Sequence, residues 1–201
     1  MNLFQKPGNS PEFILAQRTR CLTLVVEDLY QSHNAGAIVR ACDFFGILDL
    51  HVISLRNRFD LQAEFTRDMN QWLTIHRYEK RGTGHPTAEC LDALRQQGYR
   101  IAATTLRSDS VPLSDCPMDR KTALCLGTEE KGLSETAHAM ADLFVQIPML
   151  GFTQSFNVSV CAALCLQTLS AKLRASTIAW QLNPAEARAL ARSWHLREPN
   201  P

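Results

Sequence analysis

The sequence predicts an α/β fold with a mostly parallel sheet flanked by helices. Apolar runs of strand length recur along the 201 residues, and helical patterns lie between them. Most of these runs are continuous rather than alternating, as expected for strands that are buried on both faces. Apolar residues make up 45% of the chain and charged residues 20%, which is the composition of a folded domain with one sizeable core.

The predicted strands lie at 22–26, 50–55, 101–105, 123–126 and 143–147, with a weaker candidate at 73–76. Between the first two runs, a stripe at helical spacing consists of Ala37, Ile38, Ala41, Cys42 and Phe45. A second stripe consists of Ala88, Leu91 and Leu94, and Gly98 is expected to end that helix.

Three regions are expected along the chain: a leader helix at 1–20, a main domain at 21–175 and a helical tail at 176–201. Ser10 suits the cap of the leader helix, and Pro11 suits its first turn. The helix of the tail should begin near Asn183 and end near Trp194. The stretch 156–175 reads as a long helix that is apolar almost all round, so it needs cover from its own sheet and from a partner chain.

Composition excludes several classes of protein. A formal net charge of +1 excludes a histone-like basic protein. We find neither an apolar stretch of the roughly 18 residues that a membrane span needs nor a signal peptide, so we expect a cytoplasmic protein without a membrane partner. None of the seven cysteines forms a C-x-x-C pair, and the closest two, Cys161 and Cys165, are four residues apart. We therefore expect buried thiols in a reducing compartment and no metal site.

Three loop segments follow predicted strands and precede predicted helices, which is where open α/β sheets bind ligands. The first segment is HNAGAIVRAC at 33–42. Asn34 there suits a helix cap. Arg40 lies about 130° from the centre of the core stripe at 100° per residue, so packing does not explain it. The alternative is an ordinary solvated arginine.

The second segment is LGTEEKGLS at 126–134. It has the two glycines of a phosphate loop, but Leu133 stands where that motif needs lysine, which disfavours a nucleoside triphosphatase. Backbone N–H groups in such a loop can hold a polar ligand, and its two acids can favour a cation. The alternative is a plain turn from strand to helix with exposed acids.

The third segment, at 147–160, is an apolar loop with one proline that leads into a helix. The start of this helix holds Ser155, Asn157 and Ser159. Capping needs only one such residue, so three of them beside apolar positions indicate the wall of a pocket. The alternative is capping alone.

Taken together, the three segments resemble in order, spacing and wording the signature motifs of the SpoU/TrmH family. That family belongs to the SPOUT class of RNA ribose 2'-O-methyltransferases. The match runs from about residue 22 to about residue 172 and is tightest in I-P-M-x-G-x-x-x-S-x-N-V-S-V. Within the family the chain is most similar to the enzymes that modify a D-loop guanosine of tRNA. Phe156 replaces the usual leucine of the S-L-N triplet, residues 65–72 lack a small Ser/Gly run, and the chain ends before a basic extension that many relatives carry.

The resemblance implies an S-adenosylmethionine-dependent RNA ribose 2'-O-methyltransferase that acts on tRNA in preference to ribosomal RNA. It also implies a SPOUT-type sheet with a C-terminal trefoil knot that holds the cofactor, a homodimer and no metal. Two alternatives remain open: a 2'-O-methyltransferase of ribosomal RNA, and a non-catalytic knotted RNA-binding protein. A small-molecule nucleotide enzyme is disfavoured by Leu133.

The residues that the resemblance marks as catalytic are Asn34, Arg40, Glu129, Ser155 and Asn157. Those marked as holding the cofactor, mainly through their backbone, are Thr104, Gly127, Ile147, Met149 and Phe156. Family proposals let Arg40 help remove the proton of the ribose hydroxyl. A guanidinium with a pKa above about 12 is a poor base. We therefore expect Arg40 to bind the phosphate of the target nucleotide and to lower the pKa of the hydroxyl, with an RNA phosphate as a candidate first proton acceptor.

Overall fold

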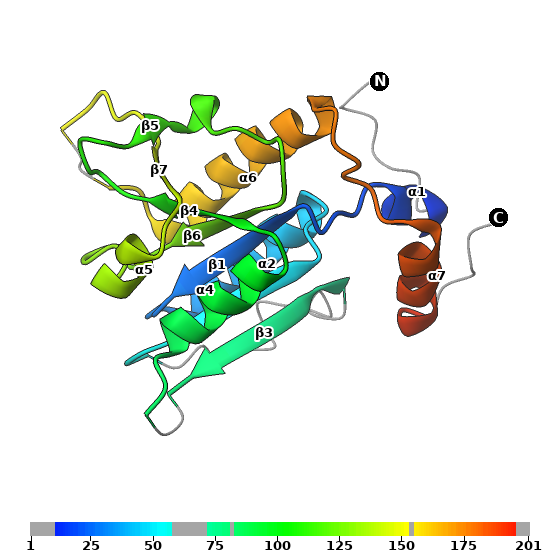
Figure 1. Cartoon of the computed structure of the whole chain (residues 1–201), viewed down its shortest axis with the longest axis horizontal. Coiled ribbons are helices and arrows are strands. Elements are labelled where there is room, and N and C mark those ends of the chain that lie inside the picture. Colours follow the sequence, from blue (N-terminus) through cyan, green and yellow to red (C-terminus); the bar gives the residue numbers. More distant parts are fainter. Residues whose placement is uncertain (1–10, 58–71, 81–82, 153–154, 196–201) are drawn as a thin grey trace.

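The computed structural model describes residues 11–57, 72–80, 83–152 and 155–195. Its centre is a seven-stranded sheet in which every neighbouring pair is parallel (Figure 1). In spatial order the strands are β3 (Thr74–Glu79), β2 (Asp49–Ser54), β1 (Leu22–Glu27), β6 (Thr122–Leu126), β4 (Arg100–Thr104), β7 (Leu143–Gln146) and β5 (Val111–Pro112). The predicted α/β class and all six predicted strands are confirmed.

Two layers of helices cover the sheet. Helices α2 (Ser32–Phe44) and α6 (Val158–Ala175) pack on one face, and α4 (Pro86–Gln96) and α5 (Glu135–Ala139) pack on the other. Successive residues of β1 point to opposite faces, so Leu24 belongs to the first core and Val25 to the second. All six residues of β1 are buried, which explains why the run is apolar without alternation.

The buried side of α2 differs from the predicted stripe. Ile38 and Cys42 are buried as expected, but Ala37 is exposed and Val39 is buried in its place. The reason is that α2 packs against α6 as well as against the sheet, which turns the buried arc of the helix toward its neighbour. Arg40 is exposed, as its position on the helical wheel predicted.

Asn34 is not the cap of α2. The helix begins at Ser32 with Gln31 in the capping position, so Asn34 lies inside the first turn and its side chain is buried. The prediction of a cap at Asn34 was therefore wrong, because the helix starts two residues earlier. Its side-chain amide donates to Gln31 Oε1 at 3.3 Å and also contacts another element of the fold, the loop that carries Glu129.

Helix α6 begins at Val158 because the Asn157 side chain caps it and accepts from the amides of Ser159 and Val160. The helix has the length and, at 1.2, the mean hydropathy of a membrane span by composition alone. Its inner side packs against β1 and α2 within the core. Its outer side leaves Val160 and Leu164 exposed. The expectation of a helix that is apolar on both sides is confirmed.

The two ends of the described chain pack together. Helix α1 (Pro11–Ala16) contacts α7 (Pro184–Ser193), and both lie to one side of the sheet (Figure 1). The Thr19 hydroxyl donates to the carbonyl of Trp180 at 2.6 Å. Asn183 and Glu186 form a capping box, so the predicted start of the tail helix is confirmed. Ser10 lies outside the described residues.

All seven cysteines are free, and five of them are buried. Burial raises the pKa of Cys42 and that of Cys90 to about 12, so both thiols stay neutral at physiological pH. The expectation of buried thiols is confirmed. Two short elements were not predicted: β5, which has two residues, and the 3-10 helix η2 (Leu113–Asp115). Neither is long enough to produce a periodic pattern.

A polar cluster lies on β2 and β3, on the face that α4 covers. Asp49 is buried and accepts from the side chains of Arg20 and His76, with 2.9 Å to the His76 Nε2. Burial alone would raise the pKa of Asp49, but these two partners hold it below its ordinary value. The ring of His51 stacks on His76 with 4.5 Å between centroids and is 4% exposed.

We expect His51 to make the fold less stable in mild acid. Burial, aided by repulsion from His76, lowers the pKa of His51 from 6.5 to about 4. Below pH 6.5 the unfolded chain binds a proton that the folded chain binds only below about pH 4. Stability therefore falls as the pH falls through this window, by about 2 kcal/mol between pH 7 and pH 5.

Denaturant titrations at pH 7 and pH 5 measure this effect. The matched variant is His51→Phe, which keeps a ring for the stack with His76 and cannot titrate. The variant should lose about 2 kcal/mol less than the parent protein on acidification. An identical loss in both proteins would show that another group is responsible.

Candidate active site

A cavity of about 420 Å³ lies at the carboxyl ends of β6, β4 and β7. This volume is within the range of about 300–1,000 Å³ that is usual for sites of small ligands. Every residue predicted to hold a cofactor lines the cavity, namely Thr104, Gly127, Ile147, Met149 and Phe156. Thr104 ends β4, Gly127 follows β6 and Ile147 follows β7. Because these strands are parallel neighbours, their ends meet at one edge of the sheet.

Three of the predicted catalytic residues meet beside this cavity. The Asn157 Nδ2 donates to Glu129 Oε1 at 2.8 Å and to Asn34 Oδ1 at 3.0 Å. The Asn34 Nδ2 donates to the same Glu129 oxygen at 3.2 Å. We call this group the polar triangle of Asn34, Glu129 and Asn157. It joins α2, the loop after β6 and the start of α6, which are far apart in the sequence.

The capping contact fixes how Asn157 is oriented. Its Oδ1 accepts from the amide of Ser159 at 2.9 Å, and only an oxygen can accept there. The Nδ2 group must therefore face Asn34 and Glu129 as a donor. The amide of Val158 also donates to Glu129 Oε1, at 3.1 Å. A single carboxylate oxygen thus accepts three hydrogen bonds, and one of them comes from the first turn of α6.

The other two predicted catalytic residues lie apart from the triangle. Ser155 is exposed and lines the cavity. Arg40 is exposed on α2 and does not line the cavity. Their roles stay predictions. Of the segment at 65–72, all but Trp72 lies outside the described residues.

The two glycines of the loop after β6 have a structural role that requires no phosphate-binding lysine. Thr128 and Gly132 pair through two backbone hydrogen bonds of 3.0 Å, which fold the loop back on itself. Gly132 has a φ of +65°, and a Cβ at Gly127 would lie 2.0 Å from the carbonyl carbon of Gly132. The glycines therefore serve a tight turn that directs Glu129 toward Asn34. Leu133 is buried in the core beneath α4 and α5.

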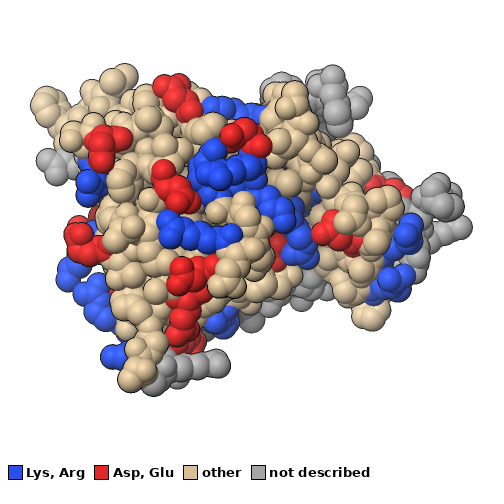
Figure 2. Space-filling view, in the orientation of Figure 1, with Lys and Arg blue, Asp and Glu red and all other residues tan. Residues whose placement is uncertain are grey.

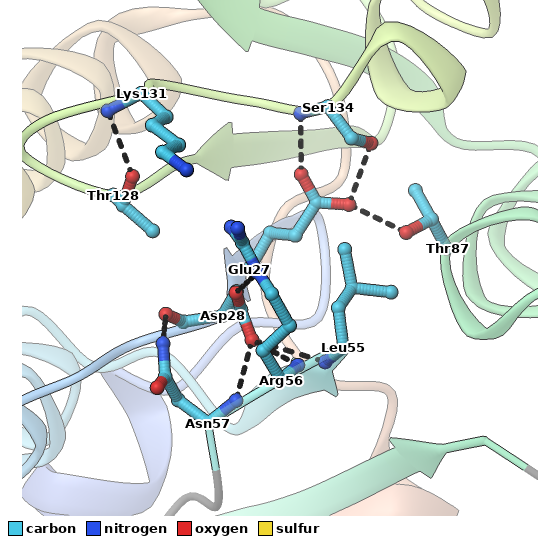
Figure 3. A network of polar contacts seen from close by, with 9 residues as sticks. All are labelled: Glu27, Asp28, Leu55, Arg56, Asn57, Thr87, Thr128, Lys131 and Ser134. Atoms are coloured by element: carbon cyan, nitrogen blue, oxygen red, sulfur yellow. Dashed lines mark hydrogen bonds and ion pairs between the residues drawn. The ribbon is translucent and has the colours of Figure 1, made fainter.

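A buried carboxylate, Glu27 at the end of β1, anchors the same loop (Figure 3). Its Oε2 accepts from the amide of Ser134 at 2.7 Å, and its Oε1 accepts from the Ser134 hydroxyl at 2.9 Å. The Thr87 hydroxyl of α4 donates to Oε1 as well, at 2.5 Å. Such donors offset the cost of burying a charge. Sequence reasoning missed Glu27, since an acid at the end of an apolar run gives no sign of what it contacts.

His138 is a second site residue that sequence reasoning missed. It lies in α5 and lines the cavity. Its Nδ1 is 3.0 Å from the carbonyl oxygen of Ser134, which can only accept, so Nδ1 carries a proton. Its Nε2 is 3.2 Å from the Thr105 hydroxyl oxygen. The sequence offers no signal for this contact, because the six histidines are scattered along it.

Comparisons with known proteins show which family the chain belongs to. A family model described as the SpoU rRNA Methylase family matches residues 21–167. The chain belongs to this family. The tRNA (guanosine(18)-2'-O)-methyltransferase of Borreliella burgdorferi is 39% identical over 175 residues, which are 87% of this chain and 78% of that protein. Asn34, Glu129 and Asn157 all fall within residues 21–167, the part of the chain that the family model matches.

Two solved structures of the SpoU type share the fold. The crystal structure of the A. aeolicus TrmH/SpoU tRNA modifying enzyme has a TM-score of 0.78 and 25% identity, and the match covers 90% of both chains. The SpoU methyltransferase AviRb from Streptomyces viridochromogenes, solved in complex with the cofactor AdoMet, has a TM-score of 0.65 and 21% identity. That match covers 81% of this chain and 64% of AviRb and concerns the fold alone.

We expect Gly127→Ala to destabilise the SpoU-type site severely. The added methyl would collide with backbone atoms of Gly132, which cannot move aside like a flexible side chain. The free energy of unfolding should fall by about 1–3 kcal/mol or more. Denaturant titration measures this loss. Gly151→Ala is the matched control, because its Cβ would meet open space and should change stability by no more than about 0.5 kcal/mol. Equal stability of the two variants would contradict the tight turn.

Proposed function

We propose that this chain is an S-adenosylmethionine-dependent methyltransferase of a ribose 2'-hydroxyl in tRNA, at a D-loop guanosine such as position 18. The observation that carries the proposal is the polar triangle of Asn34, Glu129 and Asn157 beside a cavity that every predicted cofactor residue lines. Relatives named tRNA (guanosine(18)-2'-O)-methyltransferase support the substrate.

The cavity fits such a cofactor in size and in chemistry. Leu126, Ile147 and Phe156 give it apolar walls suited to an adenine ring, and Thr105 and His138 add polar groups. When bound, S-adenosylmethionine supplies a methyl group that is already activated on a sulfonium. We propose that no metal takes part, and within the described ranges no three His, Cys, Asp or Glu side chains are grouped to hold one.

The chain itself has to position the ribose and to ease the loss of the hydroxyl proton. The triangle presents fixed amide and carboxylate groups next to the cavity, where they can orient a ribose. We propose that Arg40 binds the phosphate of the target nucleotide and lowers the pKa of the hydroxyl through its charge. An RNA phosphate, rather than the guanidinium, then takes up the hydroxyl proton as its first acceptor.

We also propose a homodimer through the outer sides of α2 and α6. These helices pack side by side and leave apolar side chains exposed, namely Phe44 at the end of α2 and Val160 and Leu164 on α6. Phe44 is 82% exposed, which is costly in water for so large a side chain. Arg40 is one turn before Phe44 on α2, so a dimer of this kind brings Arg40 against the partner subunit.

We propose a cytoplasmic location without a membrane partner. The trefoil knot and the division into a leader at 1–20, a main domain at 21–175 and a tail at 176–201 stay predictions. Methylation of ribosomal RNA stays the alternative activity.

Methyl transfer from labelled S-adenosylmethionine to purified tRNA tests the function. We expect Arg40→Ala to abolish turnover while cofactor affinity in calorimetry stays near that of the parent protein. Arg40→Lys should lose nearly as much turnover, because lysine keeps the charge but lacks the planar fork of the guanidinium. Stability should change by no more than about 0.5 kcal/mol, since Arg40 is exposed.

Each other result of that assay has a definite meaning. Near-normal turnover in Arg40→Ala would remove Arg40 from the mechanism, and near-normal turnover in Arg40→Lys would show that charge suffices. Methylation of ribosomal RNA but not tRNA would favour the alternative substrate. Cofactor-independent RNA binding without any methyl transfer would favour the non-catalytic alternative.

Sedimentation at micromolar concentration tests the dimer. The parent protein should sediment as a dimer. Val160→Glu combined with Leu164→Glu should sediment as a monomer, because two charges would be buried in the interface. Phe13→Glu is the control, since Phe13 is 39% exposed on α1, which packs against α7 and lies outside α2 and α6. A monomeric parent protein would contradict the proposal.

A further inference from the structure

The turn after β2 is tied to the end of β1 by a buried carboxylate. Asp28 is 2% exposed and has a φ of 58°, which is unusual for a residue other than glycine. Its Oδ1 accepts from the amides of Leu55, Arg56 and Asn57 at 3.1, 2.7 and 2.8 Å. Burial alone would raise the pKa of Asp28, but these amides and the Arg56 guanidinium hold it below its ordinary value. The charged carboxylate is a fixed anchor for Arg56.

Arg56 is held at one end of its guanidinium and open at the other. Its Nε donates to Asp28 Oδ2 at 3.1 Å, and its side chain is 59% exposed. Neither Nη group bonds to any residue in the described part of the chain. An arginine held through Nε keeps its two Nη groups as a fork that matches two oxygens of a phosphate. Asp28 therefore orients Arg56 before any ligand arrives.

Lys131 faces Arg56 from the loop that carries Glu129. Its amide donates to the Thr128 hydroxyl at 3.0 Å, which fixes the backbone of the tight turn. Its side chain is exposed, and its Nζ has no ion-pair partner among the residues that the structure describes. Figure 3 shows the side chains of Lys131 and Arg56 extending toward each other across one gap. Two cations that face a common space favour an anion between them.

Most acidic side chains close to this gap already accept hydrogen bonds from the protein. Glu27 accepts from Ser134 and Thr87, and Asp28 accepts from the turn after β2. Glu130, beside Lys131, is exposed and lines the cavity. Figure 2 shows basic and acidic side chains interspersed over the face that it draws, and the whole chain has a net charge of +1. An anion site on this protein therefore requires individual basic side chains that are held in position, rather than a broad positive potential.

The position of the pair relative to the proposed site indicates which anion binds. Along the carboxyl edge of the sheet, Arg56 follows β2, Asn34 follows β1, Glu129 follows β6, and the cavity continues over β4 and β7. Neighbouring strands are about 4.8 Å apart, so the end of β2 is about 10 Å from the end of β6. Lys131 lines the cavity, and Arg56 does not. A nucleotide with its ribose at the polar triangle can therefore place a backbone phosphate between Arg56 and the edge of the cavity at Lys131.

We infer that Arg56 and Lys131 bind a backbone phosphate of the RNA next to the target nucleotide, with Asp28 as the residue that positions Arg56. This inference rests on the proposed function, and it concerns a different phosphate contact from that of Arg40. Its consequence is that the pair sets RNA affinity and leaves the methyl-transfer step itself unchanged.

The test compares Arg56→Gln and Lys131→Gln with the parent protein in binding of unmodified tRNA over a range of salt concentrations. Each variant should bind tRNA about tenfold more weakly, as expected when one charged hydrogen bond is lost. Each should also reduce the slope of log affinity against log salt by about 0.7–0.9. The single-turnover rate at saturating tRNA and saturating S-adenosylmethionine should stay unchanged in both variants. The affinity for S-adenosylmethionine should stay unchanged in Arg56→Gln, and it is measured separately in Lys131→Gln because Lys131 lines the cavity. Arg56→Lys should recover the slope but only part of the affinity, because the fork is missing.

The matched controls remove the same charges from the opposite edge of the sheet. Arg95→Gln removes an arginine that is paired with Asp142, as Arg56 is with Asp28. Lys121→Gln removes an exposed lysine before β6. Both controls should keep the tRNA affinity and the salt slope of the parent protein, since they lie at the amino ends of the strands.

Three outcomes would overturn the inference. Unchanged affinity in Arg56→Gln and Lys131→Gln would do so, and so would an equal loss in the two controls. The third is a slower single-turnover rate with unchanged affinity, which would place the pair in the chemical step. Thermal unfolding of each variant confirms that it is folded, and Arg56→Lys replaces Arg56→Gln if the latter unfolds. A parent protein that binds tRNA but transfers no methyl group would defeat the proposed function alone, because the binding comparison does not depend on turnover.

Discussion

One carboxylate oxygen, Oε1 of Glu129, holds the candidate site together. It accepts hydrogen bonds from the side chains of Asn34 and Asn157 and from the amide of Val158, so it joins two helices to the loop between them. Charge-assisted bonds of this kind are stronger than neutral ones. The carboxylate can reach them only because the loop is folded tightly at its glycines and pinned by the buried Glu27 through Ser134. The site therefore also depends on the buried carboxylate of Glu27.

Different parts of the candidate site lie at the carboxyl ends of different neighbouring strands. The ends of β4 and β7 form the cavity, the ends of β1 and β6 bring the polar triangle together, and the end of β2 offers Arg56. Because all the strands are parallel, the loops that follow them meet at this edge. The order of the strands, rather than the order of the sequence, places the cavity beside the proposed phosphate contact of the RNA.

The strands were predictable because burial on both faces makes their sequences continuously apolar, as all six residues of β1 illustrate. The orientation of α2 was not, because its packing against α6 decides which side is buried, and this exposes Ala37. The motifs marked Asn34, Glu129 and Asn157 only through a resemblance. No local pattern reports a hydrogen bond between residues 95 or 123 positions apart, as in the contacts of Asn34 with Glu129 and Asn157. The roles of Glu27 and His138 could not be predicted for the same reason.

A net charge of +1 has a physical consequence for a protein proposed to bind RNA. The electrostatic part of RNA affinity grows with the number of phosphates that the protein neutralises, and here the basic side chains are interspersed with acidic ones (Figure 2). Few contacts give weak non-specific binding, so each phosphate contact has to be well oriented to matter. Orientation is what Asp28 provides for Arg56, at the cost of a backbone conformation with φ of 58°. The same carboxylate ties the turn after β2 to the end of β1 through three backbone amides, so one buried side chain both stabilises the turn and fixes the arginine that we propose to contact the RNA.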